Sequence, residues 1–262
     1  MKDYISQEKF TFSDLIDIIE CLRAPDGCPW DREQTPSSIR TNIIEEAYEL
    51  TEAIDLADDE KMCEECGDVL LQGVFCAVMR AEAGGFTVDD VINGLCKKLV
   101  GRHTHIFGRD KAKNGEEALA FWEKAKAKEK HYTSIEDKLA SVPKTFTALQ
   151  RANKVQKIVK KTGFEFPSVE EAEQKIEEEL AEFRAAEGAE KEKEGGDLLF
   201  SVVNVLRMNG IDPEVALTGT TDKFLRRFAY IISAAKEQGK NVEDMTLDEQ
   251  EKLYEEAKKK GL

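Results

Sequence analysis

Apolar residues along the chain recur at spacings of three and four, which is the period of an amphipathic helix. The clearest stripe steps by four and three through Ile43, Ala47, Leu50, Ile54 and Ala57. A helix over residues 37–56 would gather these side chains on one buried face. Convincing alternation of apolar and polar residues, which marks a half-buried strand, is absent. The pattern therefore predicts an all-α fold.

Similar stripes, separated by breaks rich in glycine and proline, divide the rest of the chain. Loops are expected over 24–31 and 163–167, Gly84-Gly85 ends a helix, and Ser168 with Glu171 forms a capping-box pattern. Further helices are expected over 13–22, 60–83, 88–100, 149–161, from 168 onward, 197–208, 213–238 and 246–259, with a connecting helix within 109–135. Because the plan repeats, two tandem helical domains are predicted, over 1–108 and 146–262, joined by a helical linker over 109–145.

One acidic spacing occurs twice, each time ahead of an apolar run. The two copies consist of Glu45, Glu46, Glu49, Glu65 and Asp68, and of Glu178, Glu179, Glu182, Glu194 and Asp197. A single acidic helix is usually just a solvated surface. Two copies with matched spacing favour a functional role instead.

The spacing also predicts how the carboxylates meet. Residues three or four apart share one face of a helix, so each pair is contiguous. The midpoint between Glu49 and Glu65 is residue 57, and the midpoint between Glu182 and Glu194 is Gly188. A helical hairpin folded at each midpoint would bring four carboxylates together, although the two turns differ in length. Such a group would repel itself unless cations lay between its members, and hard oxygen ligands suit Mg²⁺, with Mn²⁺ as a substitute.

A basic pair follows each acidic copy. Lys98 and Arg102 follow the first copy, and Lys223 and Arg227 follow the second. Each pair is four residues apart and so lies on one helical face, where it could hold phosphate oxygens opposite a metal ion. The competing interpretation is an ordinary basic surface.

The net charge of −15, from 38 basic and 53 acidic residues, argues against partners that are polyanions over a large area. No nucleic-acid polymer and no anionic membrane is expected to bind, whereas a small polyanion could bind where metal ions neutralise the carboxylates. The first residues, Met1-Lys2-Asp3-Tyr4, lack an apolar signal core, and no stretch approaches the length of a membrane span. A cytoplasmic location is therefore expected.

Six cysteines all lie within the first 96 residues and are expected to be reduced thiols. Cys63 and Cys66 have the spacing of half a zinc site that His103 and His105 could complete. Because the two cysteines flank Glu65 inside an expected carboxylate helix, incidental cysteines are the favoured interpretation.

Four segments taken together identify a family. They are Gly27-Cys28-Pro29-Trp30-Asp31-x-x-Gln34-Thr35, the first acidic copy, Arg102-His103-x-His105-x-Phe107, and the complete second copy. Over nearly its whole length the chain resembles the MazG family, nucleoside triphosphate pyrophosphohydrolases of the all-α NTP pyrophosphatase group. The acidic pattern alone is moderately specific, but its combination with the Cys-Pro-Trp-Asp loop is highly specific.

The resemblance implies a magnesium-dependent, dimeric helical enzyme that hydrolyses NTPs and dNTPs to the monophosphate and pyrophosphate. Matched by position, the metal ligands would be Glu179, Glu182, Glu194 and Asp197, with Glu46, Glu49, Glu65 and Asp68 as their counterparts. Glu178 and Glu45 would orient the attacking water. The nucleotide would contact Lys175, Lys193, Lys223, Arg226, Arg227 and Tyr254 in the second half, and Lys98, Arg102 and Trp30 in the first. Tyr254 stands where the family pattern leads us to expect tryptophan, and Gly195-Gly196 inside the second acidic pair also departs from that pattern.

Several alternatives stay open at this level. A helical binding or scaffold protein with solvated acidic faces would show no turnover, so a pyrophosphate-release assay separates it from an enzyme. A related enzyme restricted to dUTP or phosphoribosyl-ATP would also release pyrophosphate, and only a panel of nucleotides separates it. Sequence fixes neither the base preference nor which acidic copy turns over, nor whether the physiological role is removal of damaged nucleotides from the pool.

Overall fold

A computed structural model describes residues 4–262 and contains thirteen α-helices and two short 3-10 helices, with no strand among those residues. The all-α prediction is therefore confirmed. Met1, Lys2 and Asp3, three of the four residues that lack an apolar signal core, lie outside the described residues. The chain divides into two compact units, and the boundary along the sequence falls between Glu129 and Lys130. Among the described residues, no helix has both the length and the apolar content needed to cross a bilayer.

The first unit is built from helices of very different length. They are α1 (Phe12–Arg23), α2 (Pro29–Glu33), α3 (Arg40–Asp55), α4 (Asp59–Glu82), α5 (Val88–Arg102), α6 (Thr104–Phe107) and α7 (Gly115–Glu129). The first helix, expected over 13–22, begins one residue earlier and is capped by Thr11, whose hydroxyl accepts the Asp14 N–H while the Asp14 carboxylate accepts the Thr11 N–H. The helix expected within 109–135 is α7, which packs on α5 and α6.

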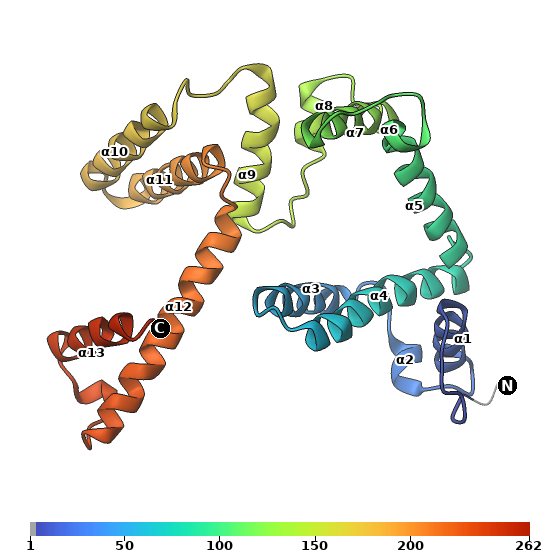
Figure 1. Cartoon of the computed structure of the whole chain (residues 1–262), viewed down its shortest axis with the longest axis horizontal. Coiled ribbons are helices and arrows are strands. Elements are labelled where there is room, and N and C mark those ends of the chain that lie inside the picture. Colours follow the sequence, from blue (N-terminus) through green and yellow to red (C-terminus); the bar gives the residue numbers. More distant parts are fainter. Residues whose placement is uncertain (1–3) are drawn as a thin grey trace. The chain divides into compact units, whose positions relative to one another are not determined.

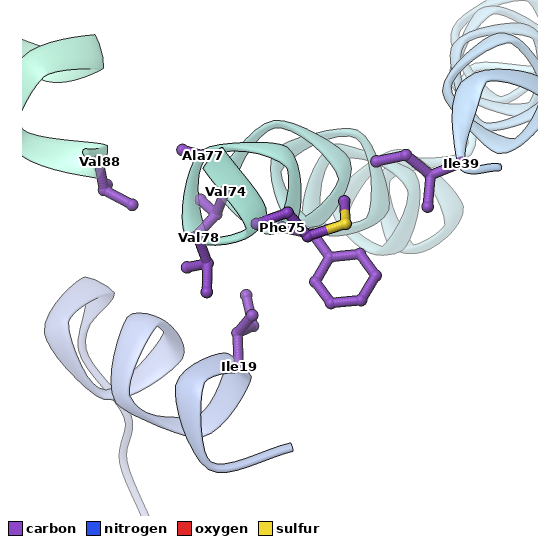
Figure 2. Close-up of a cluster of buried hydrophobic side chains, with 8 residues drawn as sticks. Ile19, Ile39, Val74, Phe75, Ala77, Val78 and Val88 are labelled. Carbon is purple, nitrogen blue, oxygen red and sulfur yellow. The ribbon is translucent and has the colours of Figure 1, made fainter. Parts of the chain in front are cut away.

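The core of the first unit lies where α1 crosses the C-terminal half of α4 (Figure 2). Val74, Phe75 and Val78 of α4 pack there with Ile19 of α1, and all four are at most 7% exposed. Val88, at the start of α5, closes the cluster. This core fixes α4, and α4 in turn positions the acidic residues on its N-terminal half.

Like the first unit, the second unit contains a long hairpin of two helices. It ends in a further pair of packed helices, α12 and α13, which we call the helical arm. Its elements are α8 (Ile135–Ala140), α9 (Ala148–Val159), η1 (Lys160–Thr162), α10 (Val169–Ala185), α11 (Gly188–Met208), α12 (Pro213–Glu237), η2 (Val242–Asp244) and α13 (Leu247–Lys259). The helix expected over 197–208 is the second half of α11, which begins nine residues earlier than predicted. α9 packs against α11, and α12 packs mainly on α13.

Both acidic copies lie on antiparallel hairpins, as the midpoint argument predicted. α3 packs along α4 and α10 packs along α11, and each pair runs side by side in Figure 1. The two predicted midpoints, Ala57 and Gly188, both adopt left-handed backbone conformations, with φ of 52° and 57°. Glycine adopts this conformation freely, whereas for a residue with a Cβ it costs roughly 1–2 kcal/mol. The first turn therefore carries a strain that the second turn avoids.

Candidate active site

In the second unit, the hairpin brings three carboxylates together across two helices. Glu179 and Glu182 come from α10 and Glu194 comes from α11. One carboxylate oxygen from each lies within 4.8 Å of the other two. Glu179 is buried, at 6% exposure, while Glu182 is open to solvent. Asp197, three residues after Glu194, is exposed and lies outside this group of three.

The negatively charged carboxylates of this cluster repel one another, and this repulsion makes their ionised forms less favourable. The pKa of Glu194 is raised by burial and then by the negative charges of Glu182, Asp197 and Glu179. Asp197 is therefore close enough to act on the cluster. A cation among these groups would relieve the repulsion and lower that pKa.

The first unit contains the matching cluster. Glu46 and Glu49 of α3 meet Glu65 of α4, again with one oxygen from each within 4.8 Å of the others. Burial, followed by the charges of Asp68 and Glu49, raises the pKa of Glu46. Burial and the charge of Glu49 likewise raise the pKa of Glu65, whose side chain is 5% exposed.

The donor set suits a hard divalent cation. Oxygens bound to one Mg²⁺ at roughly 2.1 Å lie no more than about 4.2 Å apart, so small side-chain rotations would close either cluster around an ion. Glu65 Oε2 is buried and has no hydrogen-bond partner among residues 4–262. A buried carboxylate oxygen without a partner is costly, and a metal ion would satisfy it. The metal groups found among the described residues contain neither cysteine nor histidine, and all six cysteines are free.

Lys175 is the basic residue in direct contact with the second cluster. Its Nζ donates to Glu178 Oε1 and lies 2.7 Å from both that oxygen and Glu179 Oε1. These two carboxylates raise the pKa of Lys175, so the ammonium stays charged. Glu178 is exposed but is linked through Lys175 to Glu179 of the cluster, and Glu45, its counterpart in the first unit, is also exposed. Lys193 is also exposed and pairs with Glu190 at 2.7 Å.

The remaining basic residues that the sequence predicted to contact the nucleotide in the second unit lie on the helical arm formed by α12 and α13. The guanidinium of Arg227 lies 5.3 Å from the centre of the Tyr254 ring, and its Nε donates to the Leu262 carbonyl at 2.8 Å. The Tyr254 ring lies 6.1 Å from Phe224. Lys223 is half-buried and Arg226 exposed on the same helix. The structure therefore joins Arg227 to Tyr254 on this arm, while the carboxylates lie on α10 and α11.

The three residues of the first unit that were expected to contact a nucleotide differ in their surroundings. Arg102 is 7% exposed and donates from Nε and NH2 to Glu129 at 2.7 and 3.0 Å, with its guanidinium 5.1 Å from the Trp122 ring centre. This arginine tethers α5 to α7. Lys98, one turn earlier, is exposed, as is the Trp30 side chain at 61%.

A buried ion pair that the sequence did not suggest lies beside the second cluster. Arg207 of α11 donates from NH1 and NH2 to the two Glu165 carboxylate oxygens, at 2.9 and 2.5 Å. Glu165 belongs to the Gly-Phe-Glu-Phe-Pro segment over 163–167, where the sequence predicted a loop. Forty-two positions separate the partners, so no local spacing could reveal the pair.

This ion pair predicts a pH-dependent contribution to stability. The hydrogen bonds from Arg207 hold the pKa of Glu165 below its usual value, so the carboxylate binds its proton less readily in the folded state than in the unfolded state. We expect Glu165→Gln to lower the free energy of unfolding at pH 7 by roughly 2 kcal/mol. The difference should shrink as the pH falls below about 4. Urea unfolding of both proteins between pH 3 and 7 measures it, and a difference independent of pH would contradict the assignment.

Comparison with known proteins places the chain in a family. The profile of the MazG nucleotide pyrophosphohydrolase domain matches residues 34–107, a segment that includes the first cluster.

The chain is 41% identical over 248 residues to the nucleoside triphosphate pyrophosphohydrolase/pyrophosphatase MazG of Thermotoga maritima, covering 94% of this chain and 95% of that protein. It is 36% identical over 255 residues to the nucleoside triphosphate pyrophosphohydrolase of Escherichia coli K12, covering 95% and 97%. It is 46% identical over 262 residues to the uncharacterized protein YabN of Bacillus subtilis, covering 97% of this chain but only 53% of YabN. The chain belongs to the MazG family of nucleotide pyrophosphohydrolases.

Proposed function

We infer that the chain is a nucleoside triphosphate pyrophosphohydrolase whose two acidic hairpins hold Mg²⁺. The observation that carries the inference is the convergence of Glu179, Glu182 and Glu194, and of Glu46, Glu49 and Glu65, in a chain whose full-length relatives carry that activity in their names. Asp197 and Asp68 lie close enough to influence the charge of each cluster and would complete the two ligand sets. Mn²⁺ would substitute for Mg²⁺ because both prefer oxygen ligands.

The reaction follows from the groups around the second cluster. When bound, Mg²⁺ would lower the pKa of a nearby water and neutralise phosphate charge. Glu178, held by Lys175, would orient the water toward the α-phosphorus and accept its proton. The bond from the α-phosphorus to the bridging oxygen breaks, and the monophosphate and pyrophosphate leave. Lys175 and Lys193, with Lys223, Arg226 and Arg227 of the helical arm, would stabilise the phosphate oxygens.

A direct assay tests this function. Pyrophosphate release is measured with the four NTPs, the four common dNTPs, dUTP and phosphoribosyl-ATP, in the presence of Mg²⁺ or of a chelator. Turnover of many nucleotides that the chelator abolishes supports the proposal and a role in cleaning the nucleotide pool. Release from dUTP or phosphoribosyl-ATP alone would identify a restricted enzyme. No release from any substrate would leave the helical scaffold as the function.

We further propose that the chain forms a homodimer, because α5 presents an apolar stripe to solvent. Val91, Leu95 and Leu99 follow one another at intervals of four and are 45–49% exposed. Residues at this interval share one face of a helix. A contiguous exposed apolar face is typical of a surface that another chain covers.

Dimerisation through α5 gives a measurable prediction. We expect sedimentation of the unsubstituted protein to report a dimer, and Leu95→Glu to weaken the dimer at least tenfold, since it would place a charge in an apolar interface. Lys97→Glu also introduces a negative charge at an exposed position of α5, but outside the apolar stripe, and serves as the control. A monomer at all concentrations, or an equal effect of both substitutions, would contradict the proposal.

A further inference from the structure

Gln72 of α4 is a buried polar residue that contacts the first acidic cluster. The residue is 8% exposed, and its Nε2 donates to Glu46 Oε1 at 3.4 Å across the hairpin of α3 and α4. Glu46 belongs to the cluster together with Glu49 and Glu65. Gln72 follows Asp68 by four residues, so the two side chains share one face of α4. The amide therefore lies beside the carboxylates without being one of them.

The amide oxygen of Gln72 is buried and has no hydrogen-bond partner among residues 4–262. The oxygen and nitrogen of an amide are about 2.3 Å apart, so Gln72 Oε1 lies within about 5.7 Å of Glu46 Oε1. Glu65 Oε2, in the same cluster, is a second buried oxygen without a partner among the described residues. Buried acceptors that lack a donor are costly.

The two oxygens cannot satisfy each other, because an amide oxygen and an ionised carboxylate both only accept hydrogen bonds. A ligand that satisfies both must bring positive charge and hydrogen-bond donors. A hydrated divalent cation brings both, since Mg²⁺ in proteins usually keeps several of its waters. Its charge suits Glu65 Oε2, and the O–H groups of its waters suit Gln72 Oε1.

The second unit supports its corresponding glutamate, Glu179, in a different way. The ammonium of Lys175 lies 2.7 Å from Glu179 Oε1. When the two acidic copies are aligned, the first unit has Asn42 in place of Lys175, and the second unit has Ser201 in place of Gln72. An amide supports a carboxylate without adding a positive charge that would repel a metal ion. The role of Gln72 is therefore particular to the first unit.

We propose that Gln72 is a positioning residue of the first metal site, where its Nε2 holds Glu46 and its Oε1 accepts a hydrogen bond from a hydrated divalent cation. The inference rests on the proposed function, because it requires the first cluster to hold that ion. Gln72 acts through Glu46 and through the water of the ion, and is not itself a ligand. Replacing a residue that supports metal ligands in this way typically lowers metal affinity 10–100-fold.

Binding of Mn²⁺ without nucleotide, followed by electron paramagnetic resonance, tests this role. The parent is the full chain carrying Glu179→Ala, so that the first cluster is the intact one, and adding Glu46→Ala sets the background. Gln72→Met removes both polar groups at similar length, and Gln72→Asn draws the amide back by one carbon. Gln156→Met is the matched control, because Gln156 is also buried and its Oε1 also lacks a partner among residues 4–262, but it belongs to the second unit.

We expect Gln72→Met and Gln72→Asn to weaken Mn²⁺ binding at least tenfold, and Gln156→Met to change it less than twofold. Urea unfolding gives a second readout that separates positioning from packing. Without metal, Gln72→Met should not lower the free energy of unfolding, because it removes a buried oxygen that has no partner. With Mn²⁺, the variant should gain less stability than the parent, because it binds the ion more weakly.

Three results would overturn the role of Gln72 and leave the proposed function standing. They are unchanged Mn²⁺ affinity in both Gln72 variants, an equal loss of affinity in Gln156→Met, and a loss of stability in Gln72→Met that is the same with and without metal. Failure of the parent chain to bind Mn²⁺ above the background would instead refute the first metal site of the proposed function, and this inference with it.

Discussion

Replacing Glu179 with alanine is expected to abolish pyrophosphate release by the second unit. Glu179 is the most buried carboxylate of its cluster, and its removal leaves Glu182 and Glu194 without the third member of the group. Loss of one such group from the charge-stabilising part of an active site lowers kcat on the order of 10²–10³-fold. The measurement is kcat for pyrophosphate release in a chain that also carries Glu46→Ala, so that the first unit does not mask the loss.

The two single variants, each with one cluster disabled, identify which unit hydrolyses the nucleotide. Glu46→Ala alone disables the first cluster, and Glu179→Ala alone disables the second. Glu177→Ala makes the same change of charge at an exposed position of α10 and is the matched control. Circular dichroism checks that the helices persist. Full activity in the double variant, with the fold intact, would refute both clusters as the catalytic metal sites.

Replacing Arg102 with alanine is expected to destabilise the first unit. The Arg102 side chain is 9% exposed, whereas its partner Glu129 is 38% exposed, so the pair is only partly shielded from solvent. Removing a buried arginine takes away its two hydrogen bonds to Glu129, loses the contact with Trp122 and opens space between α5 and α7. A loss of about 2–3 kcal/mol in the free energy of unfolding is expected, below the full cost of breaking a completely buried pair.

A comparison with Lys98→Ala tests the two roles suggested for this basic pair. Lys98 is exposed, so its loss should change unfolding by less than about 0.5 kcal/mol. Urea unfolding is followed by tryptophan fluorescence with Trp30→Phe in every chain, so that the signal comes from Trp122. Unchanged stability in Arg102→Ala, accompanied by a large rise in KM, would show that Arg102 binds phosphate rather than holding α7.

The geometry of the acidic hairpins could be predicted because it depends on residues that are close in the sequence. Helical spacing places Glu46 beside Glu49, and a turn at the midpoint determines which residues of the next helix they meet. Ala57 and Gly188 both take the turn conformation, so the expected register was confirmed in both units.

Features that depend on distant segments were not predictable from spacing. The role of Arg102 depends on Glu129, 27 residues away, and that of Arg207 depends on Glu165, 42 residues away. A cavity between α9, α10, α11 and the loop over 163–167 likewise arises from the packing of α9 against α11, and nothing in the sequence around Gln156 indicates an amide oxygen without a partner among residues 4–262. Phe164 and Phe166 line this cavity, which could be seen only in three dimensions.

The position of Lys175 has a consequence for the order in which ligands bind. Its ammonium contacts Glu178 and Glu179 and thereby acts as an internal counter-ion for the cluster. If Glu179 holds Mg²⁺ as proposed, the incoming ion repels this ammonium and releases it toward a phosphate group. Metal and nucleotide would then bind cooperatively, each raising the affinity of the other by the same factor. One lysine would thus suppress metal binding in the absence of substrate and promote it once the triphosphate arrives.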